Sequence, residues 1–225
     1  MTKTSHFCLT ESFLIMKYIY TLFTLLALSF GFSQETLEDF EGVSAATAEF
    51  GGATASIVDD PEMGGTHGKV AQGNSTAAGQ VWQGYTFDLN TKNLDLTATK
   101  TVMLDVYSND PIEFAVKVQA GVGGATDSTK NAAHAGTGWE TITVDLSSDT
   151  VDGTGAADGA YAQIAIYLNW DSSAGNFGTP LYKTFYIDNF VGVGIDKPAP
   201  ITPPAAGPET PPARAEEDVV SLFGA

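Results

Sequence analysis

The stretch Thr184-Phe185-Tyr186-Ile187-Asp188-Asn189-Phe190-Val191-Gly192-Val193 decides the fold of this chain. Apolar and β-branched side chains dominate it, and Tyr186 and Asp188 sit at alternating positions, which predicts a largely buried closing strand. An unpaired buried charge is costly, so a carboxylate in the middle of so apolar a strand needs a partner. We therefore expect Asp188 to meet another group elsewhere in the fold.

The expected partner lies at the other end of the folded region. Glu38-Asp39-Phe40-Glu41-Gly42 opens that region, and its acids meet Asp188 if the first and last strands lie together. Carboxylates crowded together repel one another unless a cation sits between them. A hard cation with oxygen ligands, calcium above all, resolves the repulsion. The alternative is a carboxylate that accepts backbone hydrogen bonds or pairs with a lysine.

Between Glu35 and Val193 the sequence alternates short strand patterns with turn-forming residues. Within the strand patterns an aliphatic set, such as Val102, Leu104 and Val106, alternates with a second set and is expected to form the core. No long amphipathic helical pattern interrupts the strands. The sequence therefore predicts an all-β fold, a two-sheet antiparallel β-sandwich of the jelly-roll type. The expected strands are 36–41, 55–58, 69–72, 80–89, 101–108, 112–120, 140–146, 162–169 and 183–193.

The two ends of the chain differ in character from this region. A lysine, an apolar run and small residues follow one another in 16–33, which is the pattern of a secretory signal peptide cleaved before Gln34. We expect a secreted or cell-surface protein without a membrane span after cleavage. The predicted division is upstream residues and signal peptide 1–33, sandwich 35–193, Pro-rich linker 194–215 and the start of a further module of the same polypeptide 216–225.

Charge and composition exclude several functions. The formal net charge is −17, and such a surface repels nucleic acid and anionic membranes. The single cysteine, Cys8, lies in the leader, so the mature chain has no disulfide framework, CxxC zinc site or cysteine nucleophile. Its two histidines, His67 and His134, lie in Gly-rich loops, and nothing in the sequence supports a histidine-based triad.

Aromatic residues on two of the expected strands predict a sugar-binding face. The strand around Trp82 and the strand that ends at Trp170 carry rings opposite their aliphatic core sets. A flat ring packs against the C–H face of a sugar, and neighbouring amides bond its hydroxyls. The predicted glycan-binding residues are Trp82, Tyr85, Lys117, Gln119, Tyr167, Asn169 and Trp170. The alternative is that these rings belong to the core, and then the site lies in the loops 121–136 or 171–179.

Catalysis is not indicated. A glycosidase needs two carboxylates that face each other across a cleft, and here the acids are scattered through loops such as 149–152. We expect a non-enzymatic protein. A small β-sandwich glycoside hydrolase or polysaccharide lyase, and a structural or adhesin spacer without ligand, remain the alternatives.

A series of short motifs resembles a known family. Glu38-Asp-Phe-Glu-Gly, Val81-Trp-Gln-Gly-Tyr, Gly138-Trp-Glu-Thr-Ile-Thr-Val-Asp-Leu and Phe185-Tyr-Ile-Asp-Asn-Phe occur in this order. Together they resemble the β-sandwich carbohydrate-binding modules of secreted bacterial polysaccharide-degrading enzymes of the laminarinase type. The resemblance implies a non-catalytic module that binds a neutral β-glucan such as laminarin. It also implies a structural Ca²⁺, whose acids fall on Glu41 and Asp188 with backbone carbonyls near Gly68 and Lys69.

Overall fold

The computed structural model describes residues 33–42, 47–89, 91–148, 151, 153 and 155–198. The predicted signal peptide, linker and further module lie almost wholly outside these residues. Within the described ranges the secondary structure consists of strands, and no helix there is long and apolar enough to cross a membrane. The strands are β1 Gln34–Glu38, β2 Thr47–Phe50, β3 Thr54–Asp59, β4 Lys69–Asn74, β5 Gly84–Asp88, β6 Lys92–Asp95, β7 Thr101–Ser108, β8 Ile112–Val122, β9 Ser128–His134, β10 Gly138–Asp145, β11 Ala160–Tyr167, β12 Trp170–Asp171, β13 Asn176–Phe177 and β14 Thr184–Asp196.

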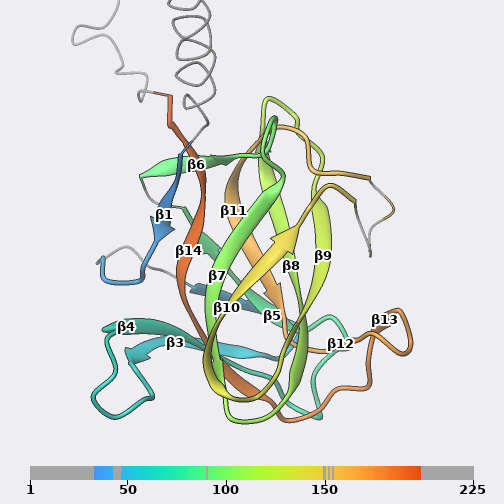
Figure 1. The fold of residues 1–225 in the computed structure, drawn as a ribbon. Helices are drawn as coiled ribbons and strands as arrows, with labels where there is room; N and C mark the ends of the chain where they lie inside the picture. Colours follow the sequence, from blue (N-terminus) through green and yellow to red (C-terminus); the bar gives the residue numbers. More distant parts are fainter. Residues whose placement is uncertain are drawn as a thin grey trace, which may run out of the picture.

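Twelve of the strands form two sheets, β12 and β13 pair separately with each other, and all pairing is antiparallel (Figure 1). In the first, sheet A, the order is β10-β7-β14-β4-β3, and β1 pairs with the second half of β14. In the second, sheet B, the order is β2-β5-β11-β8-β9. The short β6 pairs with both β11 and the end of β14, so it connects the two sheets. The predicted antiparallel sandwich is confirmed.

Strand β14 has the central position that its sequence indicates. It pairs with β4, β7, β1 and β6, and its register places Phe190 opposite Glu38 of β1. The first and last strands are therefore neighbours, as predicted. The pairing with β7 shifts between Asp188 and Val191, where Asn189 has a positive φ of 45°. This bulge interrupts the alternation immediately after Asp188.

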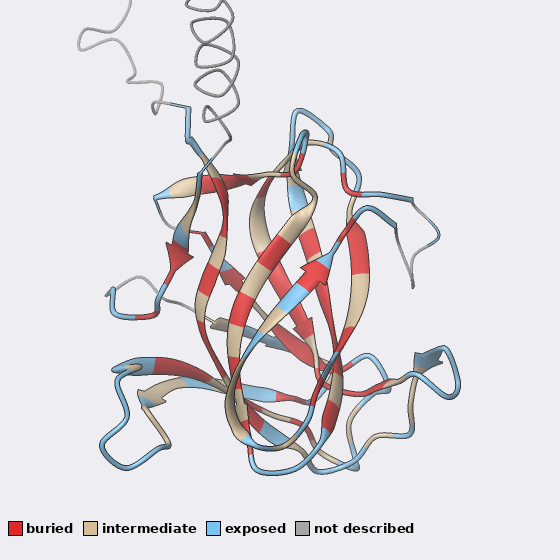
Figure 2. Cartoon of the chain, viewed as in Figure 1, coloured by how far each residue is buried: buried red, intermediate tan, exposed pale blue. Residues whose placement is uncertain are grey.

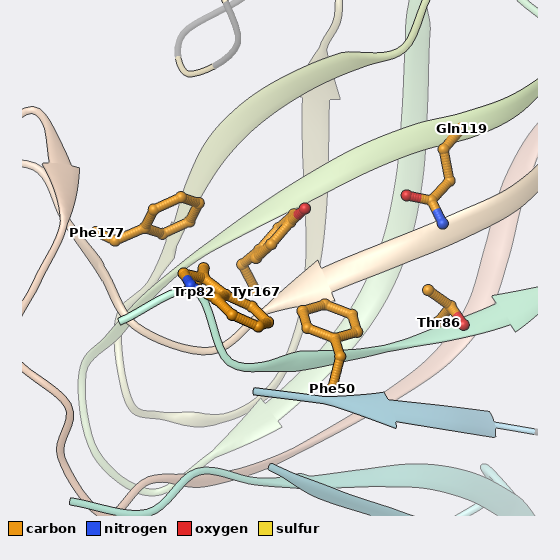
Figure 3. Close-up of a pocket in the computed structure, with 6 residues that line it drawn as sticks. All are labelled: Phe50, Trp82, Thr86, Gln119, Tyr167 and Phe177. Carbon is orange, nitrogen blue, oxygen red and sulfur yellow. The ribbon is translucent and has the colours of Figure 1, made fainter. Parts of the chain in front are cut away.

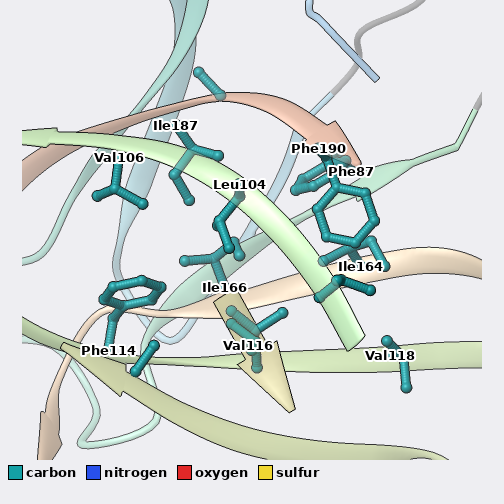
Figure 4. Packing of buried hydrophobic residues seen from close by; sticks show 14 of the residues in the cluster. Phe87, Leu104, Val106, Phe114, Val116, Val118, Ile164, Ile166, Ile187 and Phe190 are labelled. Carbon is teal, nitrogen blue, oxygen red and sulfur yellow. The ribbon is translucent and has the colours of Figure 1, made fainter. Parts of the chain in front are cut away.

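The core lies between the sheets and follows the predicted alternation. Along β7 buried and half-buried residues alternate without a break (Figure 2). Leu104 and Ile187 of sheet A face Val116 and Ile166 of sheet B (Figure 4). Full burial of an aliphatic side chain contributes about 1.5–3 kcal/mol, so this shared layer holds the two sheets together.

Three strands of four or more residues were not predicted from the sequence. They are β2, β6 and β9, and none of them has more than one large apolar residue. Strand β9 has the sequence Ser-Thr-Lys-Asn-Ala-Ala-His and pairs with β8 alone, at the edge of its sheet. An edge strand has less apolar surface to bury than a central one, so its hydrophobic pattern is weak.

Candidate functional site

The outer face of sheet B presents its side chains in three rows that run across the strands. The register of β2, β5, β11 and β8 aligns these rows. An aromatic row and a polar row lie on either side of a middle row that consists mostly of small residues. The aromatic row contains Phe50 and Tyr167, the middle row Ala48, Thr86, Ala165 and Lys117, and the polar row Asp88, Gln163 and Gln119.

The aromatic row borders a cavity of about 400 Å³, which we call the aromatic pocket (Figure 3). Four rings gather on one side of it, while Thr86 and Gln119 lie further along the sheet. The rings of Phe50 and Trp82 are stacked with centroids 6.1 Å apart, and Tyr167 is 5.3 Å from Phe50 and 5.0 Å from Phe177. The Trp82 side is open, since this residue is 44% exposed. The residues that line the aromatic pocket are Phe50, Trp82, Thr86, Gln119, Tyr167 and Phe177.

The polar row is a hydrogen-bonded ladder across three strands. Gln119 Nε2 donates to Gln163 Oε1, and Gln163 Nε2 donates to Asp88 Oδ1 at 2.7 Å. Each amide nitrogen retains a second hydrogen, and each carboxyl or carbonyl oxygen retains a lone pair. The ladder therefore fixes three polar side chains in one orientation and leaves donors and acceptors for a ligand.

A tight turn, rather than the predicted strand, presents Trp82 to solvent. The turn is closed by Gln83, whose side chain accepts from Thr76 N and donates to Thr76 O, both at 2.8 Å. Gly51 approaches it so closely that a Cβ there would lie 2.7 Å from Gln83 Cα, and its φ is +66°. The chain thus enters β5 only at Gly84, and Trp82 points away from the core.

The structure brings three of the predicted sugar-binding residues together. Trp82, Gln119 and Tyr167 line the aromatic pocket, and their binding role remains a prediction. Lys117 lies on the same face, where its Nζ is 3.3 Å from Asp127 Oδ2, and it does not line the pocket. The sequence interpretation missed Phe50, Thr86 and Phe177. Phe50 ends an unpredicted strand, and Phe177 lies in a two-residue strand that leaves no periodic signal.

The structure places the other three predicted residues outside the aromatic pocket. Tyr85 alternates with Thr86 and shares the buried face of β5 with Phe87, so it belongs to the core. Burial raises the pKa of its hydroxyl. Asn169 and Trp170 are only 1% and 3% exposed and lie outside the aromatic pocket. The alternation that places Tyr167 on the outer face ends with β11, and the chain then turns into β12.

The two predicted calcium ligands lie in one region of sheet A. Asp188 is 2% exposed, and its Oδ1 has no hydrogen-bond partner among the described residues. Burial, together with the nearby charges of Asp105, Asp39 and Glu41, raises the pKa of Asp188 to about 7. Such a carboxylate is destabilised unless a cation or a proton compensates it.

Glu41 lies close enough to Asp188 for its charge to help raise the Asp188 pKa. Its Oε1 accepts a hydrogen bond of 2.6 Å from Lys69 N. A Cβ on Gly68 would lie 1.9 Å from this oxygen, and Gly68 has a φ of +63°, so only glycine fits there. Asp188 and Glu41 offer carboxylate oxygens, which are the type of ligand that calcium prefers. Within the described residues no three His, Cys, Asp or Glu side chains cluster closely enough to hold a metal by themselves.

The outer face of sheet A also carries a cross-strand aromatic row, but a loop covers part of it. Trp139, Tyr107 and Tyr186 are aligned by the register of β10, β7 and β14. His67 stacks on Trp139 with ring centroids 3.7 Å apart. Trp139 Nε1 donates to Asp60 Oδ1 at 3.1 Å. The loop between β3 and β4 is therefore fixed against this face.

The acids and histidines of this region do not form a catalytic arrangement. Asp105 and Asp188 are opposite each other on β7 and β14, but Asp188 is too deeply buried to meet a substrate. His67 Nε2 is 3.5 Å from Asp105 Oδ2 and its ring is covered by Trp139. Both ring nitrogens of His134 are used, by Gly138 O and Gly136 N, which indicates a structural role.

Comparisons with known proteins give likenesses of structure alone. No protein-family model matches the sequence, and no curated protein matches it. Among solved structures, the family 11 carbohydrate-binding module of a cellulosomal cellulase of Clostridium thermocellum is 20% identical, over 73% of this chain and 96% of that chain, with a TM-score of 0.46. An exo-β-agarase is 15% identical over 73% of this chain and 25% of that chain, with a TM-score of 0.49. A xylan-binding domain of family 22 is 14% identical over 70% and 92%, with a TM-score of 0.41.

Proposed function

We propose that this chain is a non-catalytic carbohydrate-binding module that holds a neutral β-glucan on the outer face of sheet B. The observation that carries this proposal is the opposition of aromatic rings and the Gln119–Gln163–Asp88 ladder across a row of mostly small side chains. Rings on one side and directional polar groups on the other match the two surfaces of a sugar.

The arrangement favours an internal stretch of a polysaccharide chain. Phe50, Tyr167 and Thr86 lie on neighbouring strands, so the site extends across the sheet. A chain that lies across the strands stacks on Trp82 and Tyr167 and presents its hydroxyls to Gln119 and the rest of the ladder. The cavity of about 400 Å³ is within the range usual for ligand sites.

Charge supports a neutral glucan over an acidic polysaccharide. Asp88 ends the polar row with a carboxylate, and the chain carries a formal net charge of −17. A uronate polymer would meet this carboxylate and the overall negative field, and both lower affinity and the rate of encounter. Sugar hydroxyls, by contrast, donate to the Asp88 carboxylate.

We further propose that Asp188, Glu41 and the backbone near Gly68 and Lys69 hold a structural Ca²⁺. The ion would compensate the buried Asp188 carboxylate and fix the end of β1 to β14. The proposal includes secretion through the signal peptide and attachment to further modules of the same polypeptide, one of which would supply catalysis. These parts rest on the sequence patterns at the two ends of the chain.

Affinity electrophoresis in gels that contain a soluble polysaccharide tests the proposed function. We expect laminarin or mixed-linkage β-glucan to retard the protein, and alginate to leave its mobility unchanged. Trp82→Ala should weaken retention tenfold or more, which corresponds to about 1.4 kcal/mol or more.

Tyr182→Ala is the matched control, because Tyr182 is 79% exposed and lies outside the aromatic pocket. We expect it to retain wild-type binding. Equal retention of Trp82→Ala and Tyr182→Ala would place the glucan elsewhere, and migration unaffected by any glucan would favour a spacer module.

A further inference from the structure

The short hairpin of β12 and β13 carries one wall of the aromatic pocket. Each of its strands has two residues, and Phe177 ends the second strand. The ring of Phe177 lies 5.0 Å from that of Tyr167, measured between the ring centroids. Figure 3 shows Phe177 at the opposite end of the pocket from Thr86 and Gln119. The position of the hairpin therefore determines where the aromatic pocket ends.

The turn of this hairpin has little packing. The hairpin projects from the sandwich at the lower right of Figure 1, and residues 172–176 are exposed. Cavities of about 420 and 230 Å³ border its base, and Trp170 lines both of them. A segment that buries little apolar surface has low local stability, so it depends on hydrogen bonds for its position.

Hydrogen bonds within the turn fix its shape but not its place on the sandwich. Asp171 Oδ1 accepts from Ser173 N at 2.9 Å and from Ala174 N at 3.2 Å. Gly175 N donates to Ser172 O at 3.3 Å. Both groups of each of these bonds belong to the hairpin, so the bonds would survive a movement of the hairpin as a unit.

Glu113 of β8 joins the turn to sheet B. Its Oε2 accepts a hydrogen bond of 2.7 Å from Ser172 N, and its Oε1 accepts one from Ser172 Oγ. Hydrogen bonds to a carboxylate are stronger than those between neutral groups, and two of them from one residue also fix its orientation. Glu113 does not line the aromatic pocket, so its effect on the pocket must pass through the hairpin.

We propose that Glu113 is a positioning residue of the glucan site. By holding Ser172 it keeps the hairpin against sheet B, and it thereby keeps Phe177 in the wall of the aromatic pocket. This inference rests on the proposed function, because it adds a residue that completes the same site from outside. The sugar contacts Phe177, and Glu113 determines where that ring lies.

Glu113 also offsets the charge of a neighbouring lysine, and a conservative variant separates the two roles. Burial lowers the pKa of Lys183, and the charges of Glu113 and Asp171 oppose this effect. Glu113→Gln removes the charge, but its amide can still accept from Ser172 N and donate to Ser172 Oγ. Glu113→Ala removes both the charge and the two hydrogen bonds. A positioning role therefore predicts a defect in Glu113→Ala that Glu113→Gln largely rescues.

Nuclear Overhauser contacts between the ring protons of Phe177 and Tyr167 test the positioning without any ligand. We expect these contacts in the wild-type chain and in Glu113→Gln, and we expect Glu113→Ala to lose them. Ser172→Ala removes one of the two hydrogen bonds at an exposed residue and should weaken them, which provides a second test if Glu113→Ala does not fold. Contacts of wild-type intensity in folded Glu113→Ala, or in Ser172→Ala if Glu113→Ala does not fold, would overturn the proposal.

Titration calorimetry with a β-glucan oligosaccharide tests the consequence for binding. Phe177→Ala should lower the affinity about tenfold and Glu113→Ala about fivefold. In the Phe177→Ala background, Glu113→Ala should cause no further loss, because its effect passes through the ring that is already removed. Additive losses, or equal losses in Glu113→Ala and Glu113→Gln, would overturn the positioning role. If the wild-type chain bound no glucan, the proposed function would fall, and the Overhauser contacts would still decide whether Glu113 positions Phe177.

Discussion

The outer faces of the two sheets make an informative comparison. Each carries aromatic residues aligned across its strands: Tyr167 with Phe50, through Gly84 of β5, on sheet B, and Tyr107 with Trp139 on sheet A. On sheet A the loop from β3 to β4 covers Trp139 with His67 and fixes it with Asp60. On sheet B Trp82 remains 44% exposed beside the aromatic row.

The difference shows that an aromatic row alone does not define a binding face. What surrounds the rings determines whether they stabilise the fold or remain available to a ligand. On sheet A the Trp139 indole bonds to Asp60 at the start of the covering loop. On sheet B the polar groups of the ladder bond to one another and keep further capacity. If the rings of sheet A stabilise the fold and those of sheet B remain available to a ligand, substitutions on the two faces should have different effects.

Trp139→Ala should have the largest effect on stability. It removes the stacking with His67, the contact with Tyr107 and the hydrogen bond to Asp60. We expect a loss of about 2–4 kcal/mol in the free energy of unfolding, near the range for large-to-small aromatic substitutions. Urea denaturation measures it. Trp82→Ala should change the same quantity by less than about 1 kcal/mol, and equal losses would remove the distinction between the faces.

Removal of calcium should also destabilise the fold, because the proposed ion would fix the end of β1 to β14 in sheet A. An ion at a hundredfold excess over its Kd contributes about 2.7 kcal/mol. Chelator should therefore lower the melting temperature by roughly 5–10 °C for a chain of this size. Asp188→Ala should abolish the sensitivity to chelator. A melting curve that chelator does not change would contradict the metal proposal.

Asp60 should contribute a smaller amount to the free energy of unfolding, and this contribution should depend on pH. Burial opposes ionisation, but hydrogen bonds from Glu62 N, His67 N and Trp139 Nε1 outweigh it and lower the pKa of Asp60 below 3.8. A carboxyl with a depressed pKa stabilises the folded state above its ordinary pKa, and this contribution is lost as the pH falls through the folded-state pKa. Asp60→Asn should cost about 1–2 kcal/mol at pH 7 and less below pH 4. Calorimetry at both pH values measures it, and a cost that does not change with pH would contradict this role.

The polar ladder should give the smallest effect, and only on binding. Gln163→Ala breaks the bonds to Gln119 and Asp88 but leaves the rings in place. We expect about 1 kcal/mol, or a fivefold loss in affinity for a β-glucan oligosaccharide, with an unchanged melting temperature. Titration calorimetry measures it. Gln72→Ala on sheet A is the matched control, since Gln72 bonds Tyr186 on the opposite face and should not alter affinity.

Much of the fold follows from the sequence because burial imposes a period of two. The aliphatic sets of β7, β8 and β11 alternate as predicted, and they form the core. The pairing of the first strand with the last agrees with the expectation that the acids of Glu38–Glu41 lie near Asp188. The edge strand β9 was missed because its small and polar residues carry no such pattern.

The candidate site was only partly predictable. Tyr167 follows the alternation of β11 and lies where expected. Tyr85 does not lie on the outer face, because it shares the inward-facing side of β5 with Phe87. Phe177 joins the pocket through a short hairpin whose position depends on tertiary contacts. Side-chain direction near turns therefore needs the structure.

The three tryptophans report on three different regions, which allows one decisive measurement. Trp82 lies at the aromatic pocket, Trp139 under the loop of sheet A and Trp170 beside a cavity where β8 begins and β9 ends. A nuclear magnetic resonance titration of the ¹⁵N-labelled chain with an unsubstituted β-glucan oligosaccharide follows their indole N–H signals together. We expect a saturable shift of the Trp82 signal and little change in those of Trp139 and Trp170. A larger shift at Trp139, or no shift at Trp82 at saturating glucan, would contradict it.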